Sequence, residues 1–345
     1  MDPHIQVINK LCQTATQSGV HGYQNYKGIT GFRKAIAEWY KSIYRVQLSS
    51  ETEILPLIGS KEGIMHISLA FLDIRDKVLI PNPGYPTYTS ISNLMDARIL
   101  NYDLQETNNW EIDFKQIESL TNNGVKIMWI NYPHMPTGVK ANKHIIQQLI
   151  HLAKERRFLI VNDNPYSTIL TQKHFSIFQL KGAKDVCLEL NSLSKSHNMA
   201  GWRLGWVAGN SCFISSILKV KSNMDSGMFL GLQDAATEAL KVNSKWIRLV
   251  NMEYEARRKI VWKILDLLRC SYNKKQAGLF IWAKVPDNAV NGNDYSERIL
   301  EKAHVFITPG YIFGGNGDKF IRVSLCSNKS ILTAALKRIK NIKII

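Results

Sequence analysis

Short apolar segments alternate with longer amphipathic segments through the middle of the chain, and this alternation predicts strand–helix–strand units. A strand is predicted at 53–58, and the helix predicted after it, over 60–72, places Ile64, Ile67 and Phe71 on one face. Further strands are predicted at 77–80, 125–131, 158–162, 186–191 and 204–208, and a further helix is predicted over 144–157. The pattern indicates an α/β fold with a mostly parallel sheet flanked by helices, in which chemistry gathers where strands end.

The pattern changes after residue 210 and predicts a second, smaller α+β part. Long helices are predicted over 213–223 and 230–268, followed by a strand at 278–285, a helix at 294–303 and a strand at 319–325. We place the boundary inside the second long helical stretch. We therefore expect a large domain over 16–245 and a small C-terminal domain over 246–345, to which the N-terminal segment 1–15 is joined.

Composition places the chain among globular proteins that need no covalent staple. Its 345 residues are 45% hydrophobic and 21% charged, which excludes extensive disorder and allows a large core. Its five cysteines are scattered without a C-x-x-C pair: Cys12, Cys187, Cys212, Cys270 and Cys326. We expect a reducing cytoplasm rather than a disulfide scaffold or a cysteine-based zinc-ribbon site. No apolar run reaches the roughly 18–20 residues that span a bilayer, and the first residues do not resemble a signal peptide.

The net charge of +16 raises the question of polyanionic partners. Nucleic-acid binding proteins concentrate their charge and interleave it with aromatic residues. Here the charge is dispersed, and the densest patches, at 154–157 and 274–275, are brief. A solvated basic surface is the simpler interpretation. Strongly salt-dependent binding to DNA or RNA would be needed to support a nucleic-acid binding function.

The segment 192–205 carries the strongest chemical signal in the sequence. Lys195 follows a predicted strand, is preceded by the hydroxyls of Ser192 and Ser194, and is followed by a turn that contains Arg203. A lysine is ordinarily a solvated charge, but in such a loop it can lose its proton and condense with an aldehyde as a Schiff base. The hydroxyl of Ser192 and the guanidinium of Arg203 suit a phosphate dianion.

This segment resembles the cofactor-lysine signature of the fold-type I pyridoxal-phosphate aminotransferases of class I/II, and the resemblance runs through almost the whole chain. It implies a large cofactor-binding domain with a smaller α+β domain. It also implies that Lys195 is the Schiff-base lysine of pyridoxal 5'-phosphate, and that Ser192 and Arg203 bind the cofactor phosphate.

Asp163 and Tyr166 follow the predicted strand 158–162 and resemble the D-x-x-Y element of the family. An aspartate at a strand end is more often a turn or cap residue. The resemblance implies instead that Asp163 pairs with the pyridine nitrogen and keeps the ring an electron sink. It implies that Tyr166 donates a hydrogen bond to the phenolic oxygen of the cofactor.

Two turns add further cofactor contacts through the resemblance. Gly59, Ser60 and Lys61 lie between a predicted strand and a predicted helix, where backbone N–H groups can bind an anion. The family binds the cofactor phosphate there. The segment 83–88 resembles one whose first aromatic residue stacks on the pyridine ring, and that residue is Tyr85.

The segment 131–138 resembles the N-P-T-G loop of the family with one departure. Met135 stands immediately before Pro136, where the family has an asparagine that bonds the phenolic oxygen. A methionine offers no comparable donor. We therefore expect Tyr166 to be the main donor to that oxygen, with cofactor binding retained.

Arg322 lies on the strand predicted at 319–325. An arginine in a strand is usually an exposed edge charge. The family uses the arginine of this segment as a bidentate clamp for the substrate α-carboxylate, which is the role that the resemblance implies for Arg322.

The resemblance also implies a homodimer with shared active sites. Tyr23, five residues before Gly28, resembles a tyrosine that the family sends across the dimer interface to the cofactor phosphate, although Tyr26 lies close to it. The segment beginning at Asp2 resembles a point well inside the usual family sequence. We expect part of the family's N-terminal arm, which supplies a substrate-side glycine and dimer contacts, to be missing or replaced.

The reaction implied is transfer of an amino group between an L-amino acid and a 2-oxo acid by a ping-pong mechanism, with Lys195 as general base. The segments 55–63 and 182–186 look most like LL-diaminopimelate aminotransferases and their aspartate-type relatives. An aromatic or prephenate-type aminotransferase fits nearly as well. A pyridoxal-phosphate lyase or decarboxylase on the same scaffold is the alternative.

Overall fold

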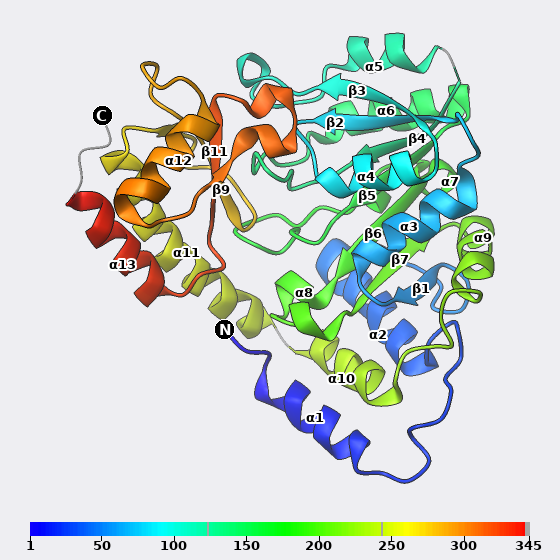
Figure 1. Cartoon of the computed structure of the whole chain (residues 1–345). Helices are drawn as coiled ribbons and strands as arrows, with labels where there is room; N and C mark the ends of the chain where they lie inside the picture. The colour runs from blue at the N-terminus through cyan, green and yellow to red at the C-terminus, as the bar shows by residue number, and fades with distance from the viewer. Residues whose placement is uncertain (123, 243, 342–345) are drawn as a thin grey trace.

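The computed structural model, which describes residues 1–122, 124–242 and 244–341, contains a larger and a smaller sheet with helices around both (Figure 1). The larger sheet has seven strands in the spatial order β1-β7-β6-β5-β4-β2-β3. These are β1 (Ile54–Leu57), β2 (Lys77–Asn82), β3 (Arg98–Asp103), β4 (Val125–Ile130), β5 (Leu159–Asp163), β6 (Cys187–Ser192) and β7 (Gly205–Gly209). The predicted α/β class is confirmed.

All neighbouring strands of this sheet are parallel except β7, which runs antiparallel to both β6 and β1. Along β4, Ile127 and Trp129 pack in one hydrophobic core, whereas Met128 and Ile130 pack in another. Side chains alternate between the two faces of a strand, so both faces of the sheet are covered. This explains the nearly continuous apolar runs in the sequence.

Helices cover both faces of the larger sheet. One face packs against α3 (Ser60–Phe71), α4 (Pro86–Leu94) and α9 (Ser211–Lys221). The other packs against α2 (Thr30–Trp39), α5 (Phe114–Thr121), α6 (Lys143–Arg156) and α10 (Leu230–Lys241). Short helices lie at α7 (Ala183–Val186) and α8 (Leu193–Ser196), and further helical turns lie at Tyr40–Tyr44, Glu106–Asn108, Ile177–Gln179, Ala200–Trp202, Gly310–Phe313 and Gly315–Gly317.

The smaller sheet is antiparallel, in the order β10-β11-β9-β8, and belongs to the C-terminal part of the chain. Its strands are β8 (Ser271–Tyr272), β9 (Phe280–Lys284), β10 (Thr308–Pro309) and β11 (Phe320–Ser324). The helices around it are α11 (Ser244–Leu267), α12 (Gly292–Ala303) and α13 (Lys329–Lys340). The prediction of one helix over 230–268 was wrong, because Val242 takes an extended ψ of 128° and ends α10 there.

The first helix, α1 (Ile5–Ala15), packs along α10. Val7 is buried in the core of the larger part, and the hydroxyl of Thr14 donates to Oδ2 of Asp234 at 3.0 Å. The division at residue 245 stays a prediction, and residue 243 beside it lies outside the described residues. In the described part of the chain, no helix is both long and apolar enough to cross a membrane.

Candidate active site

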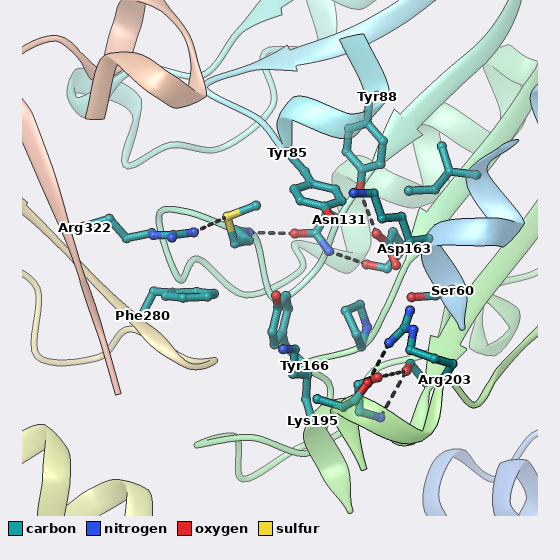
Figure 2. Close-up of a pocket in the computed structure, with 17 residues that line it drawn as sticks. Ser60, Tyr85, Tyr88, Asn131, Asp163, Tyr166, Lys195, Arg203, Phe280 and Arg322 are labelled. Carbon is teal, nitrogen blue, oxygen red and sulfur yellow. Dashed lines mark hydrogen bonds between the residues drawn. The ribbon is translucent and has the colours of Figure 1, made fainter. Parts of the chain in front are cut away.

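A cavity of about 300 Å³ lies at the carboxyl ends of the parallel strands and extends to β9 and β11 of the smaller sheet (Figure 2). It brings together ten of the residues singled out in the sequence: Ser60, Lys61, Tyr85, Met135, Asp163, Tyr166, Ser192, Lys195, Arg203 and Arg322. Gly59 lies directly beside the guanidinium of Arg203, which lines the cavity. Tyr23 lies outside the cavity, and its side chain is 93% exposed.

Lys195 is placed by a tight connection that leaves the end of β6. Ser192 is the N-cap of α8, and its hydroxyl accepts a hydrogen bond from the backbone N–H of Ser194 at 3.1 Å. This cap orients the single turn that carries Lys195 into the cavity. Among the described residues nothing accepts a hydrogen bond from Nζ of Lys195, so this nitrogen remains available to a ligand.

An anion cradle forms where α3 begins. Gly59, the N-cap of α3, has φ +90° and ψ 155°, and no side chain of the described residues caps the helix, so the first backbone N–H groups are available to a ligand. A Cβ atom on Gly59 would collide with the guanidinium of Arg203. Figure 2 shows Arg203 beside Ser60. Glycine therefore lets a cation and a helix N-terminus converge, as binding of a phosphate group requires.

The two carboxylate oxygens of Asp163 differ in their partners. Oδ2 accepts a hydrogen bond from the hydroxyl of Tyr88 at 3.0 Å, whereas Oδ1 is buried without a hydrogen-bond partner in the described residues. Burial raises the pKa of Asp163 from 3.8 to about 7, and the Tyr88 hydrogen bond opposes that rise. Asp163 is thus oriented toward the cavity and suited to a cationic partner.

Aromatic rings surround this carboxylate. Tyr88 stacks on Trp129 with centroids 5.0 Å apart and an interplanar angle of 9°. Tyr85 meets Tyr88 edge to face at 5.5 Å. Tyr166 lies across the cavity, where burial and then the charge of Asp163 raise the pKa of its phenol, so it acts as a neutral donor near neutral pH.

Met135 faces the cavity and is 5% exposed. Its sulfur accepts a hydrogen bond from Nη1 of Arg322 at 3.4 Å, and its backbone N–H donates to Oδ1 of Asn131 at 2.7 Å. The amide nitrogen of Asn131 donates to the backbone carbonyl of Asp163. Asn131 therefore ties the loop of Met135 to the end of β5.

Arg322 is held between two aromatic rings. Its guanidinium carbon lies 4.1 Å from the ring centroid of Phe280 and 4.5 Å from that of Phe313. Burial lowers its pKa, and it belongs to none of the arginine–carboxylate pairs in the described part of the chain. A stacked guanidinium without a counterion is suited to bind a carboxylate in a bidentate manner.

Three polar or aromatic cavity residues, Tyr88, Asn131 and Phe280, were given no role from the sequence. Tyr88 and Asn131 lie inside the segments 83–88 and 131–138, which the sequence did single out, but only their neighbours were given roles. Phe280 lies on a correctly predicted strand, and nothing in the sequence indicates that its ring would stack on an arginine from β11.

The chain belongs to the family described as aminotransferase class I and II, whose model matches residues 2–339. It is therefore a transaminase that uses pyridoxal 5'-phosphate, as the resemblance implied, and it serves amino-acid biosynthesis.

Its relatives carry more specific names. It is 38% identical over 326 residues to LL-diaminopimelate aminotransferase of Aquifex aeolicus, covering 94% of this chain and 84% of that one. It is 36% identical to the protein of the same name from Halothermothrix orenii, covering 97% and 86%. The apo structure of BacF from Bacillus subtilis is similar with a TM-score of 0.94 at 31% identity, covering 99% and 91%. A probable N-succinyldiaminopimelate aminotransferase from Thermus thermophilus is similar with a TM-score of 0.90 at 29% identity, covering 99% and 91%.

The cavity fits pyridoxal 5'-phosphate on three observations. The start of α3, with Gly59 and Arg203, forms a cradle for a phosphate. The unpartnered Oδ1 of Asp163 matches a protonated ring nitrogen. The amine of Lys195 lines the same cavity and matches an aldehyde.

Proposed function

We propose that this aminotransferase acts on LL-diaminopimelate or a closely similar amino donor, with Lys195, Asp163 and Arg322 as its principal active-site residues. The observation that carries the proposal is that one cavity contains an amine, a buried carboxylate, an anion cradle and an unpaired arginine. The names of the relatives, at 34–38% identity, support the substrate. A lyase or decarboxylase is not favoured by these names.

When bound, pyridoxal 5'-phosphate supplies an electron sink for the bonds at the substrate α-carbon. Lys195 would act as the general base that takes the α-proton and as the acid that gives it back, which the position of its amine at the cavity wall allows. Asp163 holds a proton on the ring nitrogen through Oδ1, while Tyr88 fixes its other oxygen. Tyr166 donates to the phenolic oxygen, since Met135 has no donor to offer.

The phosphate and the substrate are held at opposite ends of the cavity. The backbone of Gly59, Ser60 and Lys61, with Ser192 and Arg203, binds the phosphate. Tyr85, which lines the cavity, would stack on the pyridine ring. At the other end Arg322 binds the α-carboxylate, and the rings of Phe280 and Phe313 exclude water around it.

We further propose a homodimer in the cytoplasm, in which Tyr23 reaches the phosphate of the partner subunit. The 93% exposure of the Tyr23 side chain in a single chain supports an intersubunit role. All five cysteines are free, which supports a reducing compartment.

Replacement of Lys195 tests the active-site assignment. We expect Lys195→Ala to remain folded and to lose transamination, because Lys195 is the amine assigned to the cofactor aldehyde; Lys61, which lines the same cavity, is the other amine that the mapping must distinguish. Borohydride reduction of the cofactor-loaded wild type, followed by peptide mapping, should label Lys195. A label on any other lysine contradicts the assignment.

A panel of amino donors and 2-oxo acid acceptors tests the substrate. We expect kcat/KM to be highest for LL-diaminopimelate, and the loss of donor to match the formation of the new amino acid. A preference for aromatic donors would place the enzyme with the aromatic aminotransferases instead. Release of carbon dioxide or ammonia without amino transfer would indicate a decarboxylase or a lyase.

A further inference from the structure

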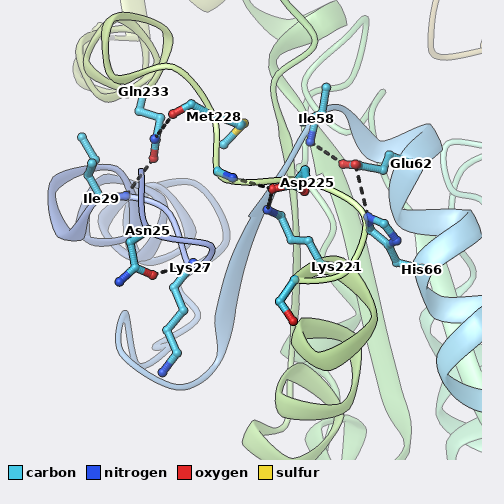
Figure 3. Close-up of polar contacts among 12 residues, drawn as sticks. Asn25, Lys27, Ile29, Ile58, Glu62, His66, Lys221, Asp225, Met228 and Gln233 are labelled. Atoms are coloured by element: carbon cyan, nitrogen blue, oxygen red, sulfur yellow. Dashed lines mark hydrogen bonds and ion pairs between the residues drawn. The ribbon is translucent and has the colours of Figure 1, made fainter. Parts of the chain in front are cut away.

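A second cluster of metal-ligand side chains lies outside the active-site cavity, where α3 meets the segment 222–229 between α9 and α10. It consists of Glu62, His66 and Asp225 (Figure 3). One ring nitrogen of His66 and one oxygen of each carboxylate all lie within 4.8 Å of one another. None of the three residues lines the cavity that we assign to the cofactor.

This cluster contains buried polar atoms without partners. His66 is 1% exposed, and neither ring nitrogen makes a hydrogen bond within the described chain, although Nε2 lies 3.2 Å from Oε1 of Glu62. Oδ2 of Asp225 is also buried without a hydrogen bond there. Leaving a buried donor or acceptor unsatisfied costs about 1–3 kcal/mol, so the cluster favours an additional partner.

The other oxygen of each carboxylate is already fixed. Oε2 of Glu62 accepts from the backbone N–H of Ile58 at 2.6 Å. Oδ1 of Asp225 accepts from Nζ of Lys221 and from the backbone N–H of Gly227, both at 2.8 Å. Hydrogen bonds of this kind orient the ligands of a metal ion from the outside and leave one oxygen of each carboxylate to bind it.

The charge and the chemistry of the cluster indicate which ion it would take. Two carboxylates and the buried ammonium of Lys221 leave a net charge of −1 when His66 is neutral, which favours a cation. An imidazole nitrogen with two carboxylate oxygens suits zinc and similar transition metals, whereas magnesium and calcium prefer oxygen ligands alone. We propose that Glu62, His66 and Asp225 bind a divalent transition metal of the zinc type, with a fourth position open to water.

The bound ion would join two segments of the larger part, α3 and the segment 222–229, and the second is linked through Gln233 to the chain near Ile29. Glu62 lies in the first turn of α3, whose start forms the anion cradle. Asp225 belongs to the segment that continues to Met228, whose carbonyl accepts from Nε2 of Gln233 at 2.6 Å. Oε1 of Gln233 accepts from the backbone N–H of Ile29 at 2.7 Å, six residues after Tyr23. The metal is therefore structural, and it stabilises the surroundings of the phosphate cradle.

Cobalt and zinc titrations of the chelator-stripped, cofactor-loaded protein test the proposal at pH 8. We expect one equivalent of Co²⁺ to give the visible absorption bands of a low-coordinate site, and Zn²⁺ to displace it and raise the Tm. Asp225→Asn and His66→Gln should lose the bands. His151→Gln, on the exposed side of α6, is the matched control and should keep them.

The wild-type titration decides the matter even if a variant fails to fold. The absence of a stoichiometric Co²⁺ spectrum from the folded wild type overturns the proposal. Bands that survive in a folded Asp225→Asn protein, as judged by circular dichroism, also overturn it.

Discussion

Asp163 combines burial with a single fixed hydrogen bond, and this makes the cofactor-free protein sensitive to pH. Its pKa of about 7 lies well above the value of 3.8 for an unfolded aspartate. Between these values the folded protein binds a proton that the unfolded chain does not. The stability that this group contributes is therefore greatest below about pH 4 and is lost as the pH rises through about 7.

Asp163→Asn should remove this dependence. One pKa unit corresponds to about 1.4 kcal/mol. In the cofactor-free state, the free energy of unfolding of the variant should therefore rise relative to that of the wild type by up to about 4 kcal/mol between pH 4 and pH 8. Urea unfolding at several pH values measures the difference. Asp287→Asn, at an exposed position, is the control, and its free energy of unfolding should differ from that of the wild type by the same amount at every pH. A constant difference for Asp163→Asn as well would mean that its carboxyl is ionised in the fold.

Arg322 provides a second prediction at the level of single residues. Arg322→Lys keeps a positive charge but loses the planar fork and the stacking between Phe280 and Phe313. We expect kcat/KM to fall roughly 30- to 150-fold for every amino donor, which corresponds to a loss of about 2–3 kcal/mol of transition-state stabilisation. Cofactor absorbance should not change. If only one class of side chain lost activity, Arg322 would select side chains, and the carboxylate would bind elsewhere.

The start of α3 shows how a backbone conformation can carry function. Gly59→Ala places a Cβ at a φ of +90° and against the guanidinium of Arg203. We expect at least a tenfold weaker affinity for pyridoxal 5'-phosphate, measured by fluorescence titration. Gly19→Ala is the matched control, because Gly19 has a φ of +80° but open space around it. The control should lose stability of about 1 kcal/mol from backbone strain while binding the cofactor normally. Equal cofactor losses in both variants would contradict a specific role for Gly59.

Strands that are buried on both faces could be predicted from apolar runs, but strand β3 could not. Its sequence, Arg98–Asp103, contains two charged and two further polar or half-polar side chains, and only Tyr102 is fully buried. It is a strand because β2 pairs with it in register from Lys77 to Asn82. That pairing is a tertiary effect which local patterning does not contain.

The same distinction separates the predicted from the unpredicted parts of the active site. Lys195 and Ser192 belong to one short segment, so their spacing in the sequence carries the chemistry. Phe280 and Phe313 contact Arg322 from separate elements that are distant in the sequence. No local sequence pattern predicts such a contact. Their residue types alone indicate only a hydrophobic core.

At the level of the whole molecule, the position of Tyr23 makes a dimer testable. Tyr23→Ala and Lys195→Ala should each be nearly inactive. If Tyr23 serves the partner's cofactor, a mixed dimer of the two variants contains one complete site. Equal mixing after unfolding and refolding should then restore about a quarter of wild-type activity, because about half of the dimers are mixed and each has one complete site.

An activity assay on the refolded mixture measures this recovery, and each variant refolded alone is the control. A mixture no more active than its parts would mean that Tyr23 serves its own subunit or has no role at the cofactor. Size-exclusion chromatography with light scattering should show twice the mass of one chain.

The antiparallel course of β7 has a consequence for the order in which this protein is built. Because β7 runs against β6, the chain returns directly through the segment that holds Lys195 and Arg203, without a crossover helix. Closing so short a connection costs little chain entropy. Arg322 lies on β11, far toward the C-terminus. The cofactor residues assigned within one chain end at Arg203. During synthesis on the ribosome, they are all present in the chain before Arg322, the residue assigned to the substrate carboxylate, has been added.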